Sequence, residues 1–407
     1  MAEALYPRPL RSSTEKELIM QFHTPHKKNS TLVTQLVCAV LFCVFSFLWL
    51  FCFQADVIAV AQHVLSGGVT HYDRTVGAVL ITLVLQILQR VVATLTRLYR
   101  RTHAVTYLPS MLVLAVISDI NADIDSHFSL GAWYWVAPLV LVLWGAFVWL
   151  ARKMLPFDSA KEPTGVFSRR VWVNVLLMSL MMMAVALIGN TNAVFHFRAH
   201  AEVALKQGDY EEALRVGSRS IESDEHLNML RMYALSRRSE LGERLFQYPV
   251  RGTGSDVLPV AGSKSRLLLL SPDALWRHLG ARPAATMNVQ RYFRALERDT
   301  LATEAVRDYQ LCANLIDRDL DAFVANLQKY YPVSDSALHR LPRYYREALT
   351  LYTHLRAHPR LVYHHNVMDE DWDNMQELER THASKDERQT AIVKRYGDSY
   401  WYYYFYK

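Results

Sequence analysis

The sequence contains little cysteine, with only four among 407 residues. Cys38, Cys43 and Cys52 share one apolar segment, and Cys312 is alone in the second half of the chain. The second half therefore cannot contain an internal disulfide. The cysteine spacing also lacks the closely spaced ligand pairs of a structural zinc site. We predict no metal centre and no bound cofactor.

Motifs for phosphate and calcium are missing as well. The glycines of Gly252-Thr-Gly254 are not followed by Gly-Lys-Ser/Thr, so they do not form a phosphate-binding loop. The acidic run from Asp119 opens like a calcium loop. It then has Ile124 where an EF-hand needs glycine and Leu130 where it needs glutamate. We interpret this run mainly as a solvated acidic loop.

A basic face is absent from the second half of the chain. Residues 190–407 carry 30 Lys and Arg against 29 Asp and Glu, whereas residues 1–189 carry 15 against 10. Nucleic-acid binding requires clustered positive charge, so we predict no nucleic-acid partner. The excess of Lys and Arg over Asp and Glu belongs to the first half, where the positions of basic residues indicate how the chain is oriented in a membrane.

Long apolar runs dominate that first half. A helix rises about 1.5 Å per residue and needs about 20 residues to cross a hydrocarbon core of about 30 Å. The first run has no signal-peptide character, because it is too long and follows a polar segment. The candidate spans are residues 32–53, 76–96, 104–118, 130–151 and 171–189.

The third candidate, 104–118, is the weak one, because it is short and contains Pro109. Loop charge favours it nonetheless. Basic residues are frequent before the first span, in 97–101 and in 152–170, but scarce in 54–75 and absent from 119–129. Five spans with a cytoplasmic N-terminus give this alternation. The C-terminal domain then lies outside the cytoplasm, whereas four spans would leave it inside.

Polar residues near the spans are the only candidates for chemistry. Arg90 lies within the second span, where an ionisable side chain is costly unless it packs, snorkels or has a function. Asp119, Asp123 and Asp125 follow the third candidate span. These four are weak catalytic candidates for a membrane-embedded enzyme or transport component, such as a glycosyltransferase with an external acidic loop.

A helical hairpin pattern begins directly after the last span. Gly208 ends one amphipathic segment, Tyr210 opens the next, and Ala213 follows three residues later. This arrangement resembles a tetratricopeptide repeat, in which a small residue lets two helices approach. Gly242 recurs 34 residues after Gly208, which is the length of that repeat. An ordinary antiparallel helix pair remains the alternative.

The remainder of the chain also has helical periodicity. Glycine and proline are dense in 250–288, which indicates an irregular connector. Helical patterns follow at about 289–315, 318–331, 342–357 and 370–396. His354, His358, His364 and His365 invite a metal site, but no glutamate accompanies them in a protease motif, and we interpret them as surface residues. The aromatic residues of 400–406 must be packed, because a free apolar tail would aggregate.

The pattern as a whole resembles an uncharacterised family of multi-span bacterial membrane proteins with a helical-repeat extracytoplasmic region. The resemblance rests on residues 195–249, especially 241–249, on 344–352 and on 399–403. It implies a location in a bacterial cytoplasmic membrane and implies no activity.

We therefore predict an all-α protein with a bundle of about five transmembrane helices followed by a helical domain. Its predicted parts are a cytoplasmic tail, the transmembrane domain, repeat-like hairpins, the connector and a C-terminal helical domain, at residues 1–30, 31–190, 191–249, 250–288 and 289–407. The predicted function is to anchor the helical domain in the bilayer so that it binds a protein or peptide partner.

Overall fold

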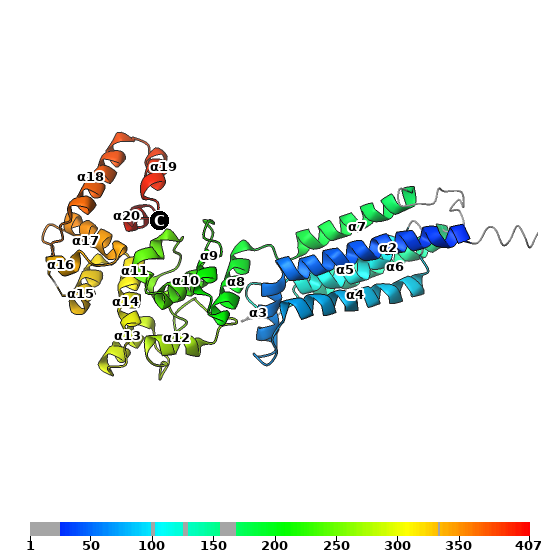
Figure 1. Cartoon of the computed structure of the whole chain (residues 1–407), viewed down its shortest axis with the longest axis horizontal. Coiled ribbons are helices and arrows are strands. Elements are labelled where there is room, and N and C mark those ends of the chain that lie inside the picture. The colour runs from blue at the N-terminus through cyan, green and yellow to red at the C-terminus, as the bar shows by residue number, and fades with distance from the viewer. Residues whose placement is uncertain (1–24, 99–101, 125–128, 155–167, 333) are drawn as a thin grey trace, which may run out of the picture. The chain divides into compact units, whose positions relative to one another are not determined.

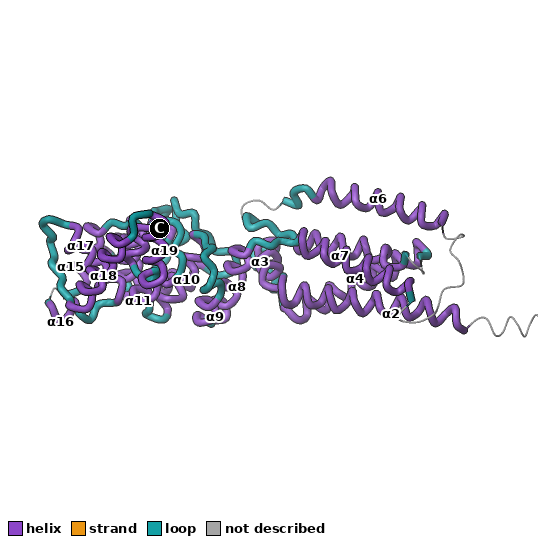
Figure 2. Tube along the Cα trace, turned by 90° about the horizontal axis from the view of Figure 1, so that it is seen from above, coloured by secondary structure: helices purple, strands orange, loops and turns teal. Residues whose placement is uncertain are grey.

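The structure is a computed structural model that describes residues 25–98, 102–124, 129–154, 168–332 and 334–407. The described residues are helical or irregular and include no strand (Figure 2). The chain divides into two compact units, Met1–Thr191 and Asn192–Lys407. The predicted all-α class is confirmed for this part of the chain.

Unit 1 contains four helices that are long and apolar enough to cross a membrane: Leu32–Phe53, Arg74–Thr96, Trp133–Lys153 and Arg169–Ile188. They belong to α2 (Pro25–Leu48) with its π-helical continuation η1 (Trp49–Phe53), α4 (Arg74–Thr96), α6 (Trp133–Met154) and α7 (Arg169–Ile188). Each begins and ends within a few residues of a predicted span. Asp73 and Ser168 cap α4 and α7 by accepting backbone N–H groups of the first turn.

The predicted span 104–118 is helical but falls short of that length. A 3₁₀ turn, η2 (His103–Tyr107), leads into α5 (Leu108–Ser118). Pro109 lies in the first turn of α5. A backbone N–H at that position would have no acceptor within the helix, so the absence of an N–H in proline costs no helical hydrogen bond. A further short helix, α3 (Ala55–Leu65), follows η1. The five-helix bundle therefore stays a prediction, and four long apolar helices are the observation.

Unit 1 displays its apolar side chains on the outside. Leu36 on α2, Leu83 on α4, Leu143 on α6 and Leu176 on α7 are each more than half exposed. α5 has the opposite pattern, and its Leu114 is fully buried. An apolar exterior would be unstable in water and is the surface that a lipid environment accommodates.

Polar contacts join α5 and η2 to the long helices around them. Gln89 donates to Thr106 Oγ1 over 2.9 Å, and the backbone N–H of Ala104 donates to Asn174 Oδ1 over 2.7 Å. At the other end of α5, Trp49 Nε1 donates to Ser118 Oγ over 2.8 Å. These buried polar groups are satisfied by one another, as an apolar surrounding requires.

Unit 2 starts with a series of helices (Figure 1). They are α8 (Ala193–Gln207), α9 (Tyr210–Arg215), α10 (Glu225–Arg237), α11 (Leu241–Arg244), α12 (Pro272–Leu279), α13 (Val289–Arg298), α14 (Glu304–Ile316) and α15 (Leu320–Tyr330). The segment predicted as one helix at 289–315 is thus two helices, α13 and α14. The predicted connector contains the short helix α12.

The C-terminal part of unit 2 closes the same hydrophobic core. It contains α16 (Asp335–Leu338), α17 (Arg343–Leu355), α18 (Asn366–Thr381), α19 (Lys385–Tyr396) and α20 (Tyr400–Tyr406). Tyr400 and Trp401 of α20 are buried, and the ring of Tyr400 lies 5.0 Å from that of Phe246. The prediction that the aromatic tail is packed is confirmed.

Candidate functional site

One of the predicted acidic residues, Asp119, lies beside a cavity at one end of unit 1. Asp119 directly follows α5 and accepts a hydrogen bond from Trp133 Nε1 over 2.8 Å. Asp119 also lines a cavity of about 490 Å³ between α3, the end of α5 and the loop after it. Asp123 is exposed in the same loop, and Asp125 lies outside the described residues.

Arg90 is not part of this arrangement. It lies six residues before the end of α4, and that end is contacted by Arg152, whose Nε donates to the Thr96 carbonyl over 2.8 Å. Asp119 instead follows the far end of α5. The structure therefore separates Arg90 from Asp119 and Asp123, and these candidates do not converge on one site. Gln86 and Gln89, beside Arg90 in the sequence, hydrogen-bond to each other over 3.2 Å.

The predicted repeat residues are found at a hairpin turn of unit 2. Gly208 ends α8 with φ of +80°, a left-handed conformation that glycine adopts without strain. Tyr210 is the first residue of α9, and Ala213 is buried within it. Asp209 caps α9 by accepting the Glu212 N–H over 2.9 Å.

Two further hairpins close in the same way. Ser239 and Arg318 take the left-handed position, with φ of +58° and +59°. Each is followed by an acidic residue whose N–H donates over 2.9 Å to a carbonyl five residues earlier, as Asp209 does to Ala204. Three hairpins, α8–α9, α10–α11 and α14–α15, thus share one turn geometry.

Gly242 does not occupy a turn. It is the second residue of α11, and the left-handed residue of that hairpin is Ser239, so the first two turns are 31 residues apart and not 34. A Cβ at Gly242 would lie 2.8 Å from both Pro342 and Tyr345. Gly242 is therefore required by the close approach of α11 to α17, and it is a packing residue.

Sequence reasoning missed Glu202, which anchors the connector. This α8 residue is fully buried, and its carboxylate accepts N–H bonds from Leu268, Leu269 and Leu270 over 2.5–3.1 Å. Arg198, one turn earlier, lies 3.6 Å from the same carboxylate. Because the backbone at these residues is irregular, their N–H groups do not belong to a helix or sheet, and the Glu202 carboxylate accepts their hydrogen bonds instead. No local pattern signals this role.

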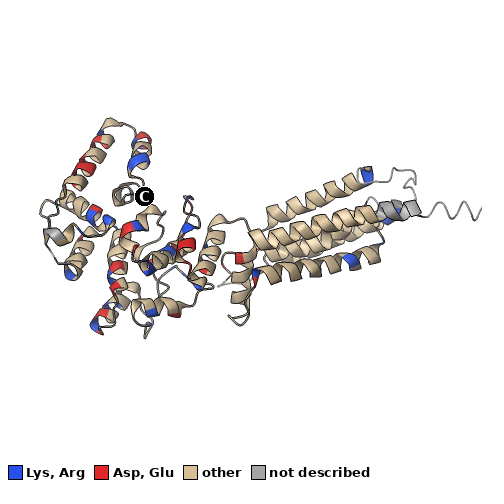
Figure 3. Ribbon diagram, in the orientation of Figure 1, with Lys and Arg blue, Asp and Glu red and all other residues tan. Residues whose placement is uncertain are grey.

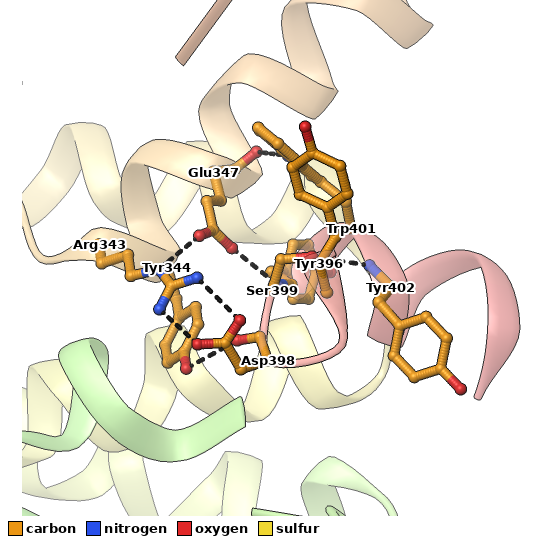
Figure 4. A network of polar contacts seen from close by, with 9 residues as sticks. Arg343, Tyr344, Glu347, Tyr396, Asp398, Ser399, Trp401 and Tyr402 are labelled. Atoms are coloured by element: carbon orange, nitrogen blue, oxygen red, sulfur yellow. Dashed lines mark hydrogen bonds and ion pairs between the residues drawn. The ribbon is translucent and has the colours of Figure 1, made fainter. Parts of the chain in front are cut away.

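A second buried carboxylate, Glu347, joins α17 to α20 (Figure 4). It accepts from Arg343 Nε over 2.7 Å and from the Tyr400 N–H over 2.6 Å. The same guanidinium reaches Asp398 over 2.9 Å. Burial raises the pKa of Glu347 to about 7, although Arg343 acts in the opposite direction. Hydrogen bonding to Arg343 lowers the pKa of Asp398.

Two of the four histidines flank one aspartate. His354 and His364 lie 3.8 and 3.5 Å from Asp369, which is in the first turn of α18. Over the ranges that the structure describes, no group of three or more histidine, cysteine or acidic side chains is arranged to hold a metal ion. Both contacts to Asp369 lie at the surface, and the ring of His354 also stacks on that of Trp372.

These features define a class of protein: in the described residues, the chain is all-helical, with four helices long and apolar enough to cross a membrane and a helical C-terminal unit. Within it, residues 282–407 match a family of unknown function, DUF6057. The match covers less than half of the chain. It includes the Glu347 network but not the hairpins before the connector. No curated protein and no solved structure matches the chain.

Proposed function

We propose that this chain is a multi-pass membrane protein whose C-terminal unit binds a protein or peptide partner on the non-cytoplasmic side of the bilayer. The observation that carries the binding role is that the three hairpins pack on one another. The orientation is supported by the distribution of charge in unit 1, and each support is independent of the other.

The two ends of the unit 1 bundle differ in charge (Figure 3). Basic residues gather where α7 begins and where α4 and α6 end: Arg97, Arg152, Lys153, Arg169 and Arg170. The opposite end carries Asp56, Asp73, Arg74, Asp119 and Asp123. Lys and Arg accumulate on the cytoplasmic side of a membrane protein, which favours a cytoplasmic N-terminus.

The segment His103–Ser118 supports a fifth crossing. Its start contacts Asn174 near the beginning of α7, and its end contacts Trp49 at the end of the first long helix. Five residues at about 2.0 Å and eleven at about 1.5 Å per residue give it a length of roughly 26 Å. This approaches the hydrocarbon thickness of about 30 Å. Because neighbouring helices shield its ends, the segment need not be as long as a lipid-facing span.

The hairpins support binding through their arrangement. α10 packs on α8 and α9, α14 packs on α10 and α11, and α17 packs on α15. α11 packs in addition on α17. Helix pairs that stack on one another form extended surfaces, and proteins use such surfaces to bind elongated partners. The tetratricopeptide-like interpretation of these hairpins is part of the proposal.

Topology is tested by a reporter fused after Lys407. Alkaline phosphatase, which is active only outside the cytoplasm, should be active there, and a cytoplasmic reporter at the same point should be silent. The reverse pair of results would mean an even number of crossings and a cytoplasmic C-terminal unit.

Binding is tested by photocrosslinking in the native membrane. A photoreactive residue replaces Glu211, Glu243 or Asp321, which are exposed on the second helices of the three hairpins. We expect the three positions to capture the same protein. Glu377, exposed on α18, is the matched control position. A lack of crosslinks, or equal capture from position 377, would contradict binding by the hairpin array.

A further inference from the structure

The cavity beside Asp119 is lined mainly by apolar side chains. α3 contributes Ile58 and Leu65, and α5 contributes Ile117. Ile124 and Leu130 complete the lining from the loop that follows α5. Its volume of about 490 Å³ lies within the range of about 300–1,000 Å³ that is usual for pockets of small ligands.

Most of the side chains that an occupant of this cavity would contact are apolar. Covering these side chains with an apolar group removes their surface from water, which is favourable in proportion to the area covered. Water is a poor substitute over the apolar part of the lining, since it needs several polar partners. In a chain whose four long helices expose leucine and valine on their outer faces, the abundant apolar molecule is a lipid.

The rim of the cavity is polar and bears no positive charge. Gln62, Ser66, Asp119 and Asn121 are among the lining residues, and neither lysine nor arginine is. One oxygen of Asp119 accepts from Trp133, and the other has no hydrogen-bond partner within the described ranges. Such a rim accepts hydrogen bonds from a donor such as an ammonium group, and it offers no cation to an anionic headgroup.

We propose that this cavity holds one hydrocarbon chain of a membrane lipid whose amine headgroup donates to the rim at Asp119. The inference uses only the membrane location from the proposed function. It requires neither the orientation of the chain nor the hairpin array. α3 forms one wall of the site and the end of α5 the other, so the lipid bridges two segments that are distant in the sequence.

The test uses the full-length protein in phosphatidylcholine nanodiscs. These contain a trace of phosphatidylethanolamine with a photoreactive diazirine on one acyl chain. After irradiation, mass spectrometry maps the labelled peptides. We expect the label to concentrate on the segments around 58–66 and 116–124. Labelling spread evenly over α2, α4, α6 and α7, with no enrichment at the cavity, would overturn the proposal.

Two variants narrow the cavity independently. Leu65→Trp changes an exposed residue of α3, and Ile117→Trp changes a half-buried residue of α5. Either should reduce cavity labelling several-fold, whereas Leu83→Trp on the outer face of α4 should not. Undiminished labelling in both cavity variants contradicts the site. If one variant fails to fold, the other variant and the distribution of label in the wild type still test the proposal.

The headgroup is tested by exchanging the probe. Phosphatidylglycerol with the same photoreactive chain should label the cavity less than phosphatidylethanolamine does. Asp119→Asn retains an acceptor for Trp133 but removes the charge, and it should abolish that difference. Equal labelling by both probes in the wild type would overturn the amine assignment. The phosphatase fusion remains a separate test, so failure of the lipid site and failure of the proposed topology are distinguishable.

Discussion

The buried carboxylate of Glu347 should be the main attachment of α20 to unit 2. Its side chain is only 4% exposed, and it is bonded to Arg343 and to the Tyr400 N–H. Glu347→Ala leaves that N–H buried without an acceptor, which costs about 1–3 kcal/mol. In this variant the guanidinium of Arg343, which is 31% exposed, still has its ion pair with Asp398. Its charge is therefore not left unpaired.

Breaking a buried ion pair usually costs about 3–5 kcal/mol of unfolding free energy. We expect Glu347→Ala to cost an amount at the lower end of this range. At about 1.4 kcal/mol per tenfold change, a loss of about 3 kcal/mol raises the opening equilibrium roughly 150-fold.

Cys312 provides a local assay for this opening in the intact protein. It is the only cysteine of unit 2, it is 1% exposed, and its Sγ lies 3.7 Å from the Tyr345 hydroxyl on α17. Burial raises the pKa of its thiol, so labelling by a thiol reagent has to proceed through opening of the unit. The labelled fraction of the Cys312 peptide is followed in time by mass spectrometry.

The matched control is Glu377→Ala, a change of the same type at an exposed position of α18. It should alter stability by less than about 0.5 kcal/mol, which is about twofold in labelling rate. If Glu347→Ala accelerates labelling no more than this control does, the carboxylate does not hold α20, and the reasoning is refuted.

Other predictions concern pH and the hairpins. Because the folded pKa of Glu347 is raised from 4.5 to about 7, its stabilising contribution is complete below about pH 4.5 and declines as pH rises to about 7. The thermal midpoint of wild type minus that of Glu347→Gln should fall over this range, and a constant difference would contradict the shift. Gly208→Ala should cost about 1–2 kcal/mol through its φ of +80° alone, since a Cβ there meets no atom within 4 Å. Gly242→Ala should destabilise unit 2 by about 1–3 kcal/mol through overpacking against Pro342 and Tyr345. A rate of Cys312 labelling equal to that of the wild type would contradict this and would show that α17 can move aside. Ala213→Leu should destabilise by about 1–3 kcal/mol and Glu211→Leu by less than about 1 kcal/mol, and equal effects in urea unfolding would remove Ala213 from the helix contact.

The features that depend on local composition could be predicted from the sequence. The four long apolar helices could be predicted because membrane insertion depends on the summed hydropathy of a contiguous segment. The turn at Gly208 could be predicted because glycine is the residue that enters the left-handed region without strain. The burial of 400–403 followed from the instability of an exposed aromatic tail.

Two features of the hairpins depend on tertiary packing. Residues other than glycine take the left-handed turn position in two of them, and one glycine lies at a close contact between helices. Ser239 and Arg318 adopt left-handed conformations that their side chains disfavour, because the packing of each hairpin over-determines the turn. Gly242 looked like a turn residue in the sequence, and only its contact with Pro342 and Tyr345 shows otherwise.

The polar anchors and the cavity were also beyond local reasoning. Glu202 bonds to residues 66–68 positions away, and Glu347 to one 53 positions away. The cavity is formed by segments on either side of α4 in the chain. Sequence periodicity reports which face of a helix is apolar, but the partner of a buried carboxylate and the walls of a cavity depend on which distant segments the fold brings together.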